Sequence, residues 1–218
     1  MEALHRKREL ESLAEGDILV YLDAGCTINA RARKRFDEYI ELARKTECGV
    51  VCFEQKGLPE REWCKADLLQ YAGALDDPAI TETPQFMSGL FIIRKCPLSI
   101  EFVDKWYDLS HNHFNLTTDE PSALPNLEGF RENRHDQSAF SVLLKPYKPC
   151  ILDCSETWVK ADSFEQFAKA LAAAGMPFWA SRKKTYTRAW RMKDKLSHPT
   201  RTAHSALKKI ARLMGRGS

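Results

Sequence analysis

The residues Ile18-Leu19-Val20-Tyr21-Leu22-Asp23-Ala24-Gly25 give the strongest indication of the architecture of this chain. The first five are all apolar and have the length of a strand, which is typical of a central parallel strand covered on both faces. The run stops at Asp23, and Ala24-Gly25 ends the strand. Because ligands of open α/β sheets bind at the carboxyl ends of the strands, Asp23 lies where a binding site is expected.

Apolar runs of strand length alternate with helical segments along the chain. Further strands are expected at residues 48–53, 86–93 and 150–154, and helices at residues 2–14, 30–45, 59–71, 99–110, 138–144 and 164–174. This alternation predicts an α/β fold of the Rossmann-like kind, with a mostly parallel sheet flanked by helices. Residues 112–133 are polar and contain proline, so we expect a surface loop that contacts substrate.

The composition is that of one globular domain. The 218 residues are 44% hydrophobic, which is enough for a single core of useful size. The sequence has no apolar run of 18 residues, and its charged N-terminus has no apolar signal segment. The cysteine count is seven, an odd number that favours reduced thiols. These features together predict a cytoplasmic protein.

A basic tail follows the domain at residues 182–218. It carries 12 Lys and Arg and one acid, and because the whole chain has a net charge of +3, the remaining residues are acidic, at −8. Ala203, Leu207, Ile210 and Met214 share one helical face, which predicts a basic amphipathic helix on the inner, anionic surface of a membrane. A solvated tail is the alternative. The aromatic spacing does not match an RNA-stacking surface, so no nucleic acid is expected.

Asp23 and Gly25 have a plausible role in binding a phosphorylated ligand. A carboxylate at this position can hold Mg²⁺ or Mn²⁺ against a pyrophosphate, since both ions prefer oxygen ligands. Gly25 would let the backbone approach a phosphate or a sugar closely. The alternative is an acid that caps the next helix or closes a turn.

The run Arg134-His135-Asp136-Gln137 places four ligand-binding side chains directly before a helix. Arg134 could neutralise a phosphate, His135 could bind a metal or a phosphate, and Asp136 could accept a proton from a hydroxyl group. The alternative is that Asp136 or Ser138 caps the helix and that the others are solvated.

Ser88-Gly89 interrupts the apolar run at residues 86–93. Glycine inside a strand usually marks a bulge or a close approach by another group. We therefore expect these residues to line a ligand pocket, or alternatively to let a neighbouring helix pack closely.

Taken in this order, the three motifs resemble those of GT-A glycosyltransferases, which use nucleotide sugars. The likeness rests on Tyr21-Leu22-Asp23-Ala24-Gly25-Cys26-Thr27-Ile28-Asn29, Phe86-Met87-Ser88-Gly89-Leu90-Phe91-Ile92-Ile93-Arg94 and Arg134-His135-Asp136-Gln137-Ser138-Ala139-Phe140-Ser141. They look most like poorly characterised bacterial transferases of capsule, lipopolysaccharide and other surface glycans. The resemblance covers most of the chain, from residue 12 to about residue 182.

The resemblance implies a GT-A-like domain at residues 1–181 and a sugar transfer reaction. The donor would be a nucleotide-diphosphate sugar, and the acceptor a glycan or a lipid-linked molecule. Asp23 would hold the donor and a divalent cation, with His135 as a further metal ligand, and Ser88-Gly89 would line the sugar pocket. Asp136, with Arg134, His135 and Gln137 beside it, would contact the acceptor or the transferred sugar, as general base in an inverting enzyme or by positioning the acceptor in a retaining one.

Two departures from the family pattern concern the donor site. Gly25 stands where the second carboxylate of the family's DxD motif is found, which leaves Asp23 as a single acid. One helix precedes Ile18, whereas about three strand–helix units bind the nucleotide in the family, so we expect a domain that lacks its N-terminal part. The alternative function is a catalytically inactive GT-A-like module whose basic tail binds a membrane or another polyanion.

Overall fold

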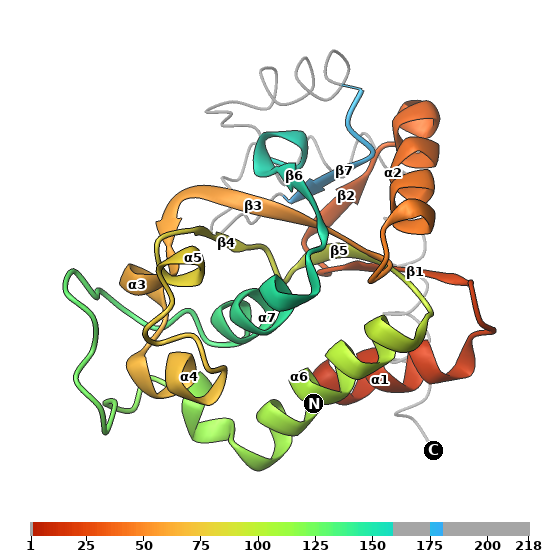
Figure 1. Cartoon of the computed structure of the whole chain (residues 1–218). Coiled ribbons are helices and arrows are strands. Elements are labelled where there is room, and N and C mark those ends of the chain that lie inside the picture. The colour runs from red at the N-terminus through yellow and green to blue at the C-terminus, as the bar shows by residue number, and fades with distance from the viewer. Residues whose placement is uncertain (1, 159–174, 181–218) are drawn as a thin grey trace, which may run out of the picture.

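The computed structural model describes residues 2–158 and 175–180 (Figure 1). The helix expected at residues 164–174 and the basic tail at residues 182–218 lie outside the described residues. Within the described part of the chain, none of the helices combines the length and the apolar character needed to cross a bilayer.

The main sheet has five strands, with β3 at its centre. The strands are β1 (Ile18–Leu22), β3 (Val50–Pro59), β4 (Pro84–Phe86), β5 (Leu90–Arg94) and β6 (Cys150–Asp153), in the order β1-β5-β3-β4, with β6 also paired to β3. The long strand β3 pairs with β5 near Val50 and with β4 from Glu54 onward. The β4–β5 connection therefore runs past β3 and carries Ser88-Gly89.

The expectation of a mostly parallel sheet is wrong. The pairs β1–β5, β3–β4 and β3–β5 are antiparallel, and only β3–β6 is parallel among the strands of the described residues. The error arose because an apolar run of residues indicates that a strand is buried, and not whether it runs parallel or antiparallel to its neighbours. The run Ile18–Leu22 is also not central, because β1 stands at the end of the strand order and its five residues are half-buried.

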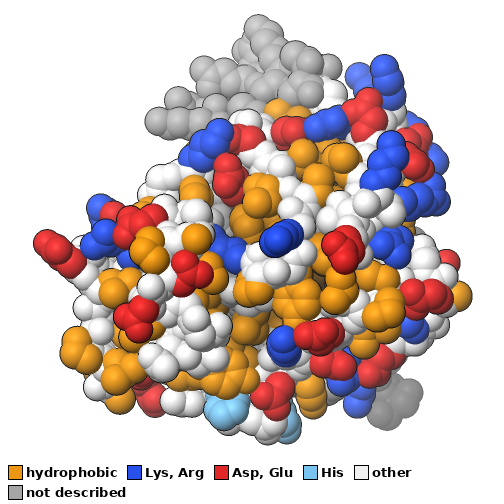
Figure 2. Space-filling view, viewed as in Figure 1, with side chains coloured by type: hydrophobic (Ala, Val, Ile, Leu, Met, Phe, Trp, Pro, Cys, Tyr) orange, Lys and Arg blue, Asp and Glu red, His pale blue; other side chains and the backbone are white. Residues whose placement is uncertain are grey.

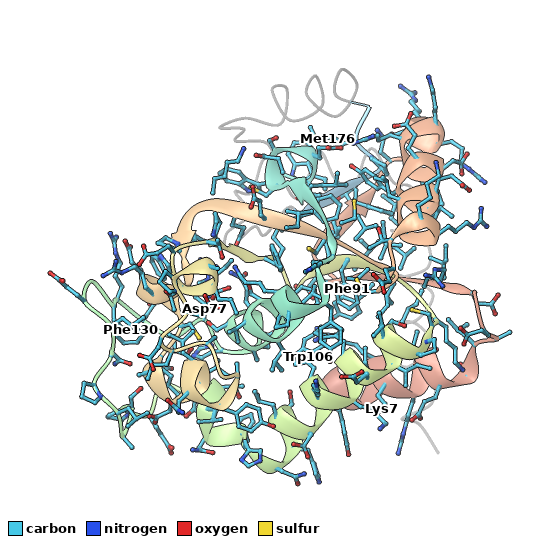
Figure 3. All side chains as sticks on the ribbon, in the orientation of Figure 1. Lys7, Asp77, Phe91, Trp106, Phe130 and Met176 are labelled. Atoms are coloured by element: carbon cyan, nitrogen blue, oxygen red, sulfur yellow. The ribbon has the colours of Figure 1, made fainter. Side chains whose placement is uncertain are left out.

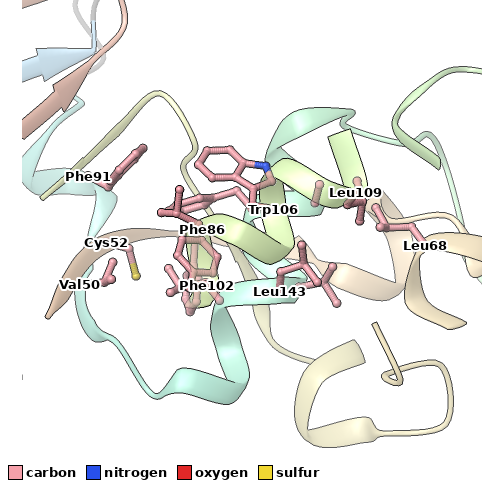
Figure 4. Packing of buried hydrophobic residues seen from close by; sticks show 14 of the residues in the cluster. Val50, Cys52, Leu68, Phe86, Phe91, Phe102, Trp106, Leu109 and Leu143 are labelled. Carbon is pink, nitrogen blue, oxygen red and sulfur yellow. The ribbon is translucent and has the colours of Figure 1, made fainter. Parts of the chain in front are cut away.

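Both faces of the central strands are covered. Alternate residues of β5 point to opposite faces, as strand geometry requires, so that Phe91 and Ile93 pack in one cluster and Leu90 and Ile92 in the other. The first cluster lies under α1 (Glu2–Ser12), α6 (Pro97–Asn112) and α7 (Asp136–Leu144) (Figures 1 and 4). Its aromatic centre joins Phe91 to Trp106, whose ring centroids are 6.0 Å apart (Figure 3).

The second cluster lies under α2 (Arg33–Lys45), on the other side of the sheet (Figure 1). A small antiparallel sheet that the sequence did not predict completes this side, and it consists of β2 (Cys26–Ile28) and β7 (Phe178–Ala180). Phe178 is buried and its ring meets that of Phe36 edge-on, at 5.7 Å between centroids. The segment after Asp23 is thereby fixed against α2.

The remaining elements are short. They are α3 (Glu60–Trp63), α4 (Ala66–Tyr71), α5 (Pro78–Thr81), and the 3₁₀ turns Ala30–Ala32, Phe114–Thr117, Lys145–Tyr147 and Cys154–Glu156. Two single elements expected from the sequence are each divided in two. The helix expected at residues 59–71 breaks where Cys64 and Lys65 are extended, and the strand expected at residues 86–93 breaks at Ser88-Gly89.

Candidate functional site

Ser88-Gly89 is the point at which the three sequence motifs meet. The backbone carbonyl of Gly89 accepts a hydrogen bond from the Asp23 amide at 2.9 Å. The hydroxyl of Ser88 donates to Asp136 Oδ2 at 3.0 Å. The short connection between β4 and β5 thus forms hydrogen bonds with both predicted acids, Asp23 and Asp136, although these acids are far apart in the sequence.

Asp23 follows β1 directly, and its carboxylate lies against Gly89. A Cβ atom at position 89 would stand 2.5 Å from Asp23 Oδ2, far inside an ordinary contact, so no other residue fits there unless Asp23 moves. The other carboxylate oxygen accepts a hydrogen bond from the Tyr21 hydroxyl at 3.1 Å. Asp23 is exposed, and its carboxylate is therefore accessible to a ligand.

Gly25 lies in the turn that follows Asp23. The amide of Cys26 donates to the carbonyl of Asp23 at 2.8 Å and closes this turn. Gly25 is exposed beside Asp23, which is consistent with the close backbone approach expected from the sequence.

Asp136 is the first residue of α7 and follows a tight turn. The Gln137 amide donates to the carbonyl of Arg134 at 3.1 Å, and His135 has φ 52° and ψ −121°. These angles are those of the first central position of a type II′ turn, which glycine normally occupies. A histidine there stores about 1–3 kcal/mol of backbone strain, and such strain gathers at functional sites.

His135 and Arg134 face the long loop and the α3 segment. His135 Nε2 lies 2.7 Å from Asp119 Oδ1, in a solvent-exposed contact that is an ion pair when the imidazole is protonated. The guanidinium of Arg134 stands over the ring of Trp63, 5.7 Å from its centroid, and Arg131 lies over the same ring at 5.6 Å. These contacts orient both predicted side chains at the entrance to α7.

Gln137 is tied into the protein by its amide group. Its Nε2 donates to Gln55 Oε1 and to Gln85 Oε1, each at 2.8 Å. Both amide protons are therefore engaged within the protein, and only the oxygen of Gln137 is left for the substrate contact expected from the sequence.

A buried polar network supports the start of α7. Gln85 Nε2 lies within hydrogen-bond distance of three acceptors, Glu60 Oε2 at 3.0 Å, the carbonyl of Trp63 at 3.1 Å and Ser138 Oγ at 3.1 Å. Ser138 donates in turn to the carbonyl of Trp63 at 2.6 Å. The network joins β4, α3 and α7, and these are the elements that place Ser88 beside Asp136.

Glu60 is the ionisable centre of this network, and it was not identified from the sequence. The side chain is fully buried, and Lys145 Nζ lies 3.2 Å from Glu60 Oε1. Ser141 donates to the same oxygen. Burial raises the pKa of Glu60 above its ordinary value, and the charge of Lys145 opposes that rise.

The loop at residues 112–133 is anchored along its length. Lys65 is buried, and its Nζ donates to the carbonyls of Asn115, Thr118 and Glu120 at 2.6, 3.4 and 3.3 Å. Asp67 accepts hydrogen bonds from the next loop amides, those of residues 123 and 124, at 2.8 and 2.9 Å. These hydrogen bonds therefore hold the loop in one position beside Asp136.

The metal site expected at Asp23 and His135 is not formed by protein ligands alone. Across residues 2–158 and 175–180, no three His, Cys, Asp or Glu side chains gather in a way that could hold an ion. Mg²⁺ is commonly held by one or two carboxylates together with substrate phosphates and water. The exposed carboxylate of Asp23 fits that kind of site and not a closed protein cage.

Comparisons with known proteins give one distant structural likeness. No protein-family model and no curated protein sequence matches the chain. Its fold is similar to the crystal structure of mouse xyloside xylosyltransferase 1 in its apo form, with a TM-score of 0.44 and 11% sequence identity. The match covers 85% of this chain and 64% of that protein, so the chain spans less than two thirds of its length. A similarity this distant does not assign an activity to the chain.

A cavity of about 680 Å³ lies away from these residues. It is bordered by α6, α7 and the turn after α7, and its apolar lining includes Leu98, Leu143 and Pro146. Figure 2 shows apolar side chains gathered near the middle of this face, with charged side chains around them. None of the sequence-predicted site residues borders this cavity.

Proposed function

We propose that this chain is a glycosyltransferase domain that moves a sugar from a nucleotide-diphosphate sugar to a glycan or lipid-linked acceptor. The observation that supports the proposal best is the meeting of Asp23 and Asp136 at Ser88-Gly89. Three motifs with the order of the GT-A family in the sequence also lie together in space. Such convergence is what a donor site beside an acceptor site requires.

Asp23 is the donor-binding acid in this proposal. Its exposed carboxylate would bind a Mn²⁺ or Mg²⁺ ion, and the phosphates of the donor and water would complete the coordination. The ion would supply positive charge to the leaving nucleoside diphosphate. Gly89 leaves room for the Asp23 carboxylate itself, and the exposed Gly25 beside it would let the donor approach the backbone closely.

Asp136 is the acid that faces the reacting sugar. The hydrogen bond from Ser88 to Oδ2 fixes the carboxylate, and the other oxygen can accept a proton from the acceptor hydroxyl in an inverting reaction. In a retaining reaction the same carboxylate would position the acceptor and stabilise positive charge on the sugar ring. Arg134, His135 and the side-chain oxygen of Gln137 would bind the acceptor or the transferred sugar.

The basic tail suggests where the acceptor is found. Residues 182–218 carry 12 basic groups and one acid, a composition that favours an anionic membrane surface. In this proposal the tail brings the domain to the inner face of the membrane, where a lipid-linked acceptor would be displayed.

The test is donor turnover with a panel of UDP- and GDP-sugars, in Mn²⁺ and in EDTA, with nucleotide release as the signal. Asp136→Asn should lower turnover by about 10²- to 10⁴-fold, the usual contribution of a general acid–base group. Asp23→Asn should instead weaken nucleotide binding. The control is Asp37→Asn, which alters an exposed acid on α2 that pairs with Arg33 and should leave both quantities unchanged.

The absence of nucleotide binding to the full chain would contradict the transferase. An Asp136→Asn variant as active as the wild type would contradict the role of Asp136. Binding of the full chain to anionic vesicles without any nucleotide affinity would favour the inactive module in its place.

A further inference from the structure

The hydroxyl of Tyr21 donates a hydrogen bond to Asp23 Oδ1 at 3.1 Å. Residues i and i+2 of a strand point to the same face, so a tyrosine at the end of β1 naturally reaches the residue that follows the strand. Hydrogen bonds to a charged acceptor are stronger than neutral ones. The contact therefore restricts the rotation of an otherwise exposed side chain.

The ring of Tyr21 is itself held in place. It faces Phe91 across the β1–β5 pair, and the two rings stack at 5.1 Å with an angle of 18°. The guanidinium of Arg6, from α1, lies 4.1 Å from the Tyr21 centroid and 4.4 Å from that of Trp106. Arg6 is almost fully buried. A cation over a phenol ring is attracted to the electron density of the ring face, which holds the ring in place.

Gly89 restricts the other side of the same carboxylate. Asp23 Oδ2 occupies the space where a Cβ of residue 89 would lie, and the Asp23 amide is bonded to the Gly89 carbonyl. One carboxylate oxygen is thus directed by Tyr21 and the other lies against a bare backbone. Together these contacts restrict the orientation of the acid.

We infer that Tyr21 is a positioning residue, whose hydroxyl holds the carboxylate of Asp23 in the orientation that would bind the divalent cation of the donor diphosphate. The inference rests on the proposed transferase function, because it assigns a role to Tyr21 within that donor site. Tyr21 does not touch the donor and acts through Asp23.

The test compares Tyr21→Phe with Tyr71→Phe in the full chain. Both changes remove only a hydroxyl that donates to an aspartate, since Tyr71 donates to Asp108 Oδ2 at 3.0 Å, on α6 and away from Asp23. Two quantities are measured: the ¹³C chemical shift of the Asp23 carboxyl group, and the affinity for UDP and GDP in the presence of Mn²⁺.

Tyr21→Phe should change the Asp23 carboxyl resonance and weaken nucleoside diphosphate binding by about tenfold, the worth of one hydrogen bond to a charged group. The donor KM should rise by a similar factor while kcat stays within about twofold, because uniform binding is what is lost. Tyr71→Phe should change the Asp108 resonance and leave nucleotide affinity and the Asp23 resonance at their wild-type values.

An unchanged Asp23 resonance in Tyr21→Phe would overturn the inference, and so would a changed resonance with wild-type nucleotide affinity. A wild-type chain without nucleotide affinity would instead overturn the transferase function and with it the donor role of Tyr21. The carboxyl resonance would then still decide whether Tyr21 orients Asp23, so the two failures can be told apart.

Discussion

The two acids of the candidate site are supported in different ways. Asp136 begins a helix whose first turn rests on a buried polar network with the fully buried Glu60 at its centre. Asp23 follows a half-buried strand at the end of the sheet and is held by one hydroxyl and by the absence of a side chain at Gly89.

Because of this difference, we expect changes on the Asp136 side to affect stability and changes on the Asp23 side to affect ligand binding. Changes on the Asp136 side leave buried polar groups without partners, which costs far more than the hydrogen bonds themselves are worth. Changes on the Asp23 side act on an exposed carboxylate that can rotate into water. We therefore expect variants of the buried network under Asp136 to lose stability, and variants around Asp23 to stay folded and lose affinity.

The largest effect is expected at Lys145. Lys145→Met leaves Glu60 buried without its cation, and breaking such a pair costs about 3–5 kcal/mol of unfolding free energy. Urea denaturation followed by circular dichroism measures the loss. The double variant Glu60→Gln/Lys145→Met should recover much of it, because no charge is then buried alone, and a double variant as unstable as the single one would contradict this account.

The pH dependence of Lys145→Met follows from the pKa of Glu60, which burial raises. An acid whose pKa is higher in the folded state binds more protons there, so it supports folding at low pH and loses that support as the pH rises through its folded value. The variant should therefore lose less stability near pH 5 than near pH 8. An equal loss at both pH values would mean that Glu60 does not change its protonation state in this range.

Gly89→Ala tests the Asp23 side directly. The new Cβ would stand 2.5 Å from Asp23 Oδ2 and force that carboxylate to rotate. We expect nucleoside diphosphate affinity to fall at least tenfold, about 1.4 kcal/mol, while the unfolding free energy changes by less than about 1 kcal/mol. In a double-mutant cycle with Asp23→Ala, additive effects on affinity would show that the clash lies elsewhere.

His135→Gly removes a strained residue from the turn before α7. Glycine adopts φ 52° and ψ −121° readily, so the variant should be more stable by about 1 kcal/mol. His135→Ala is the matched control, since it loses the ring but keeps the strain, and it should not be stabilised. Thermal unfolding of both variants provides the measurement, and equal melting temperatures would argue against strain at this residue.

The smallest effect is expected at Asp119. Its ion pair with His135 is exposed on both sides, and exposed pairs contribute about 0–1 kcal/mol. Asp119→Asn should change the unfolding free energy by no more than about 0.5 kcal/mol, as measured in urea. A loss above 2 kcal/mol would mean that this pair belongs with the buried network.

The sequence predicted the local features of the site and missed its long-range support. An acid that follows an apolar strand, a glycine within an apolar run and an acid at a helix start are each visible within a few residues, and the structure places Asp23, Gly89 and Asp136 accordingly. The antiparallel pairing was missed because an apolar run of residues is expected for a buried strand of either direction. Glu60 was missed because it stands among polar residues, and its burial depends on Lys145, which is distant in the sequence.

The position of β1 at the end of the strand order also affects when it joins the sheet during folding. Within the described sheet β1 joins through β5 alone, with Ile18 opposite Arg94, so its pairing requires the closure of a long segment of chain. Contacts between distant residues form late, because the entropy of closing the loop opposes them until other contacts exist. The network beneath Asp136 joins equally distant residues, since Glu60 and Ser141 lie 81 positions apart. Both sides of the site therefore depend on late contacts, and we expect the two acids to meet only when folding is nearly complete.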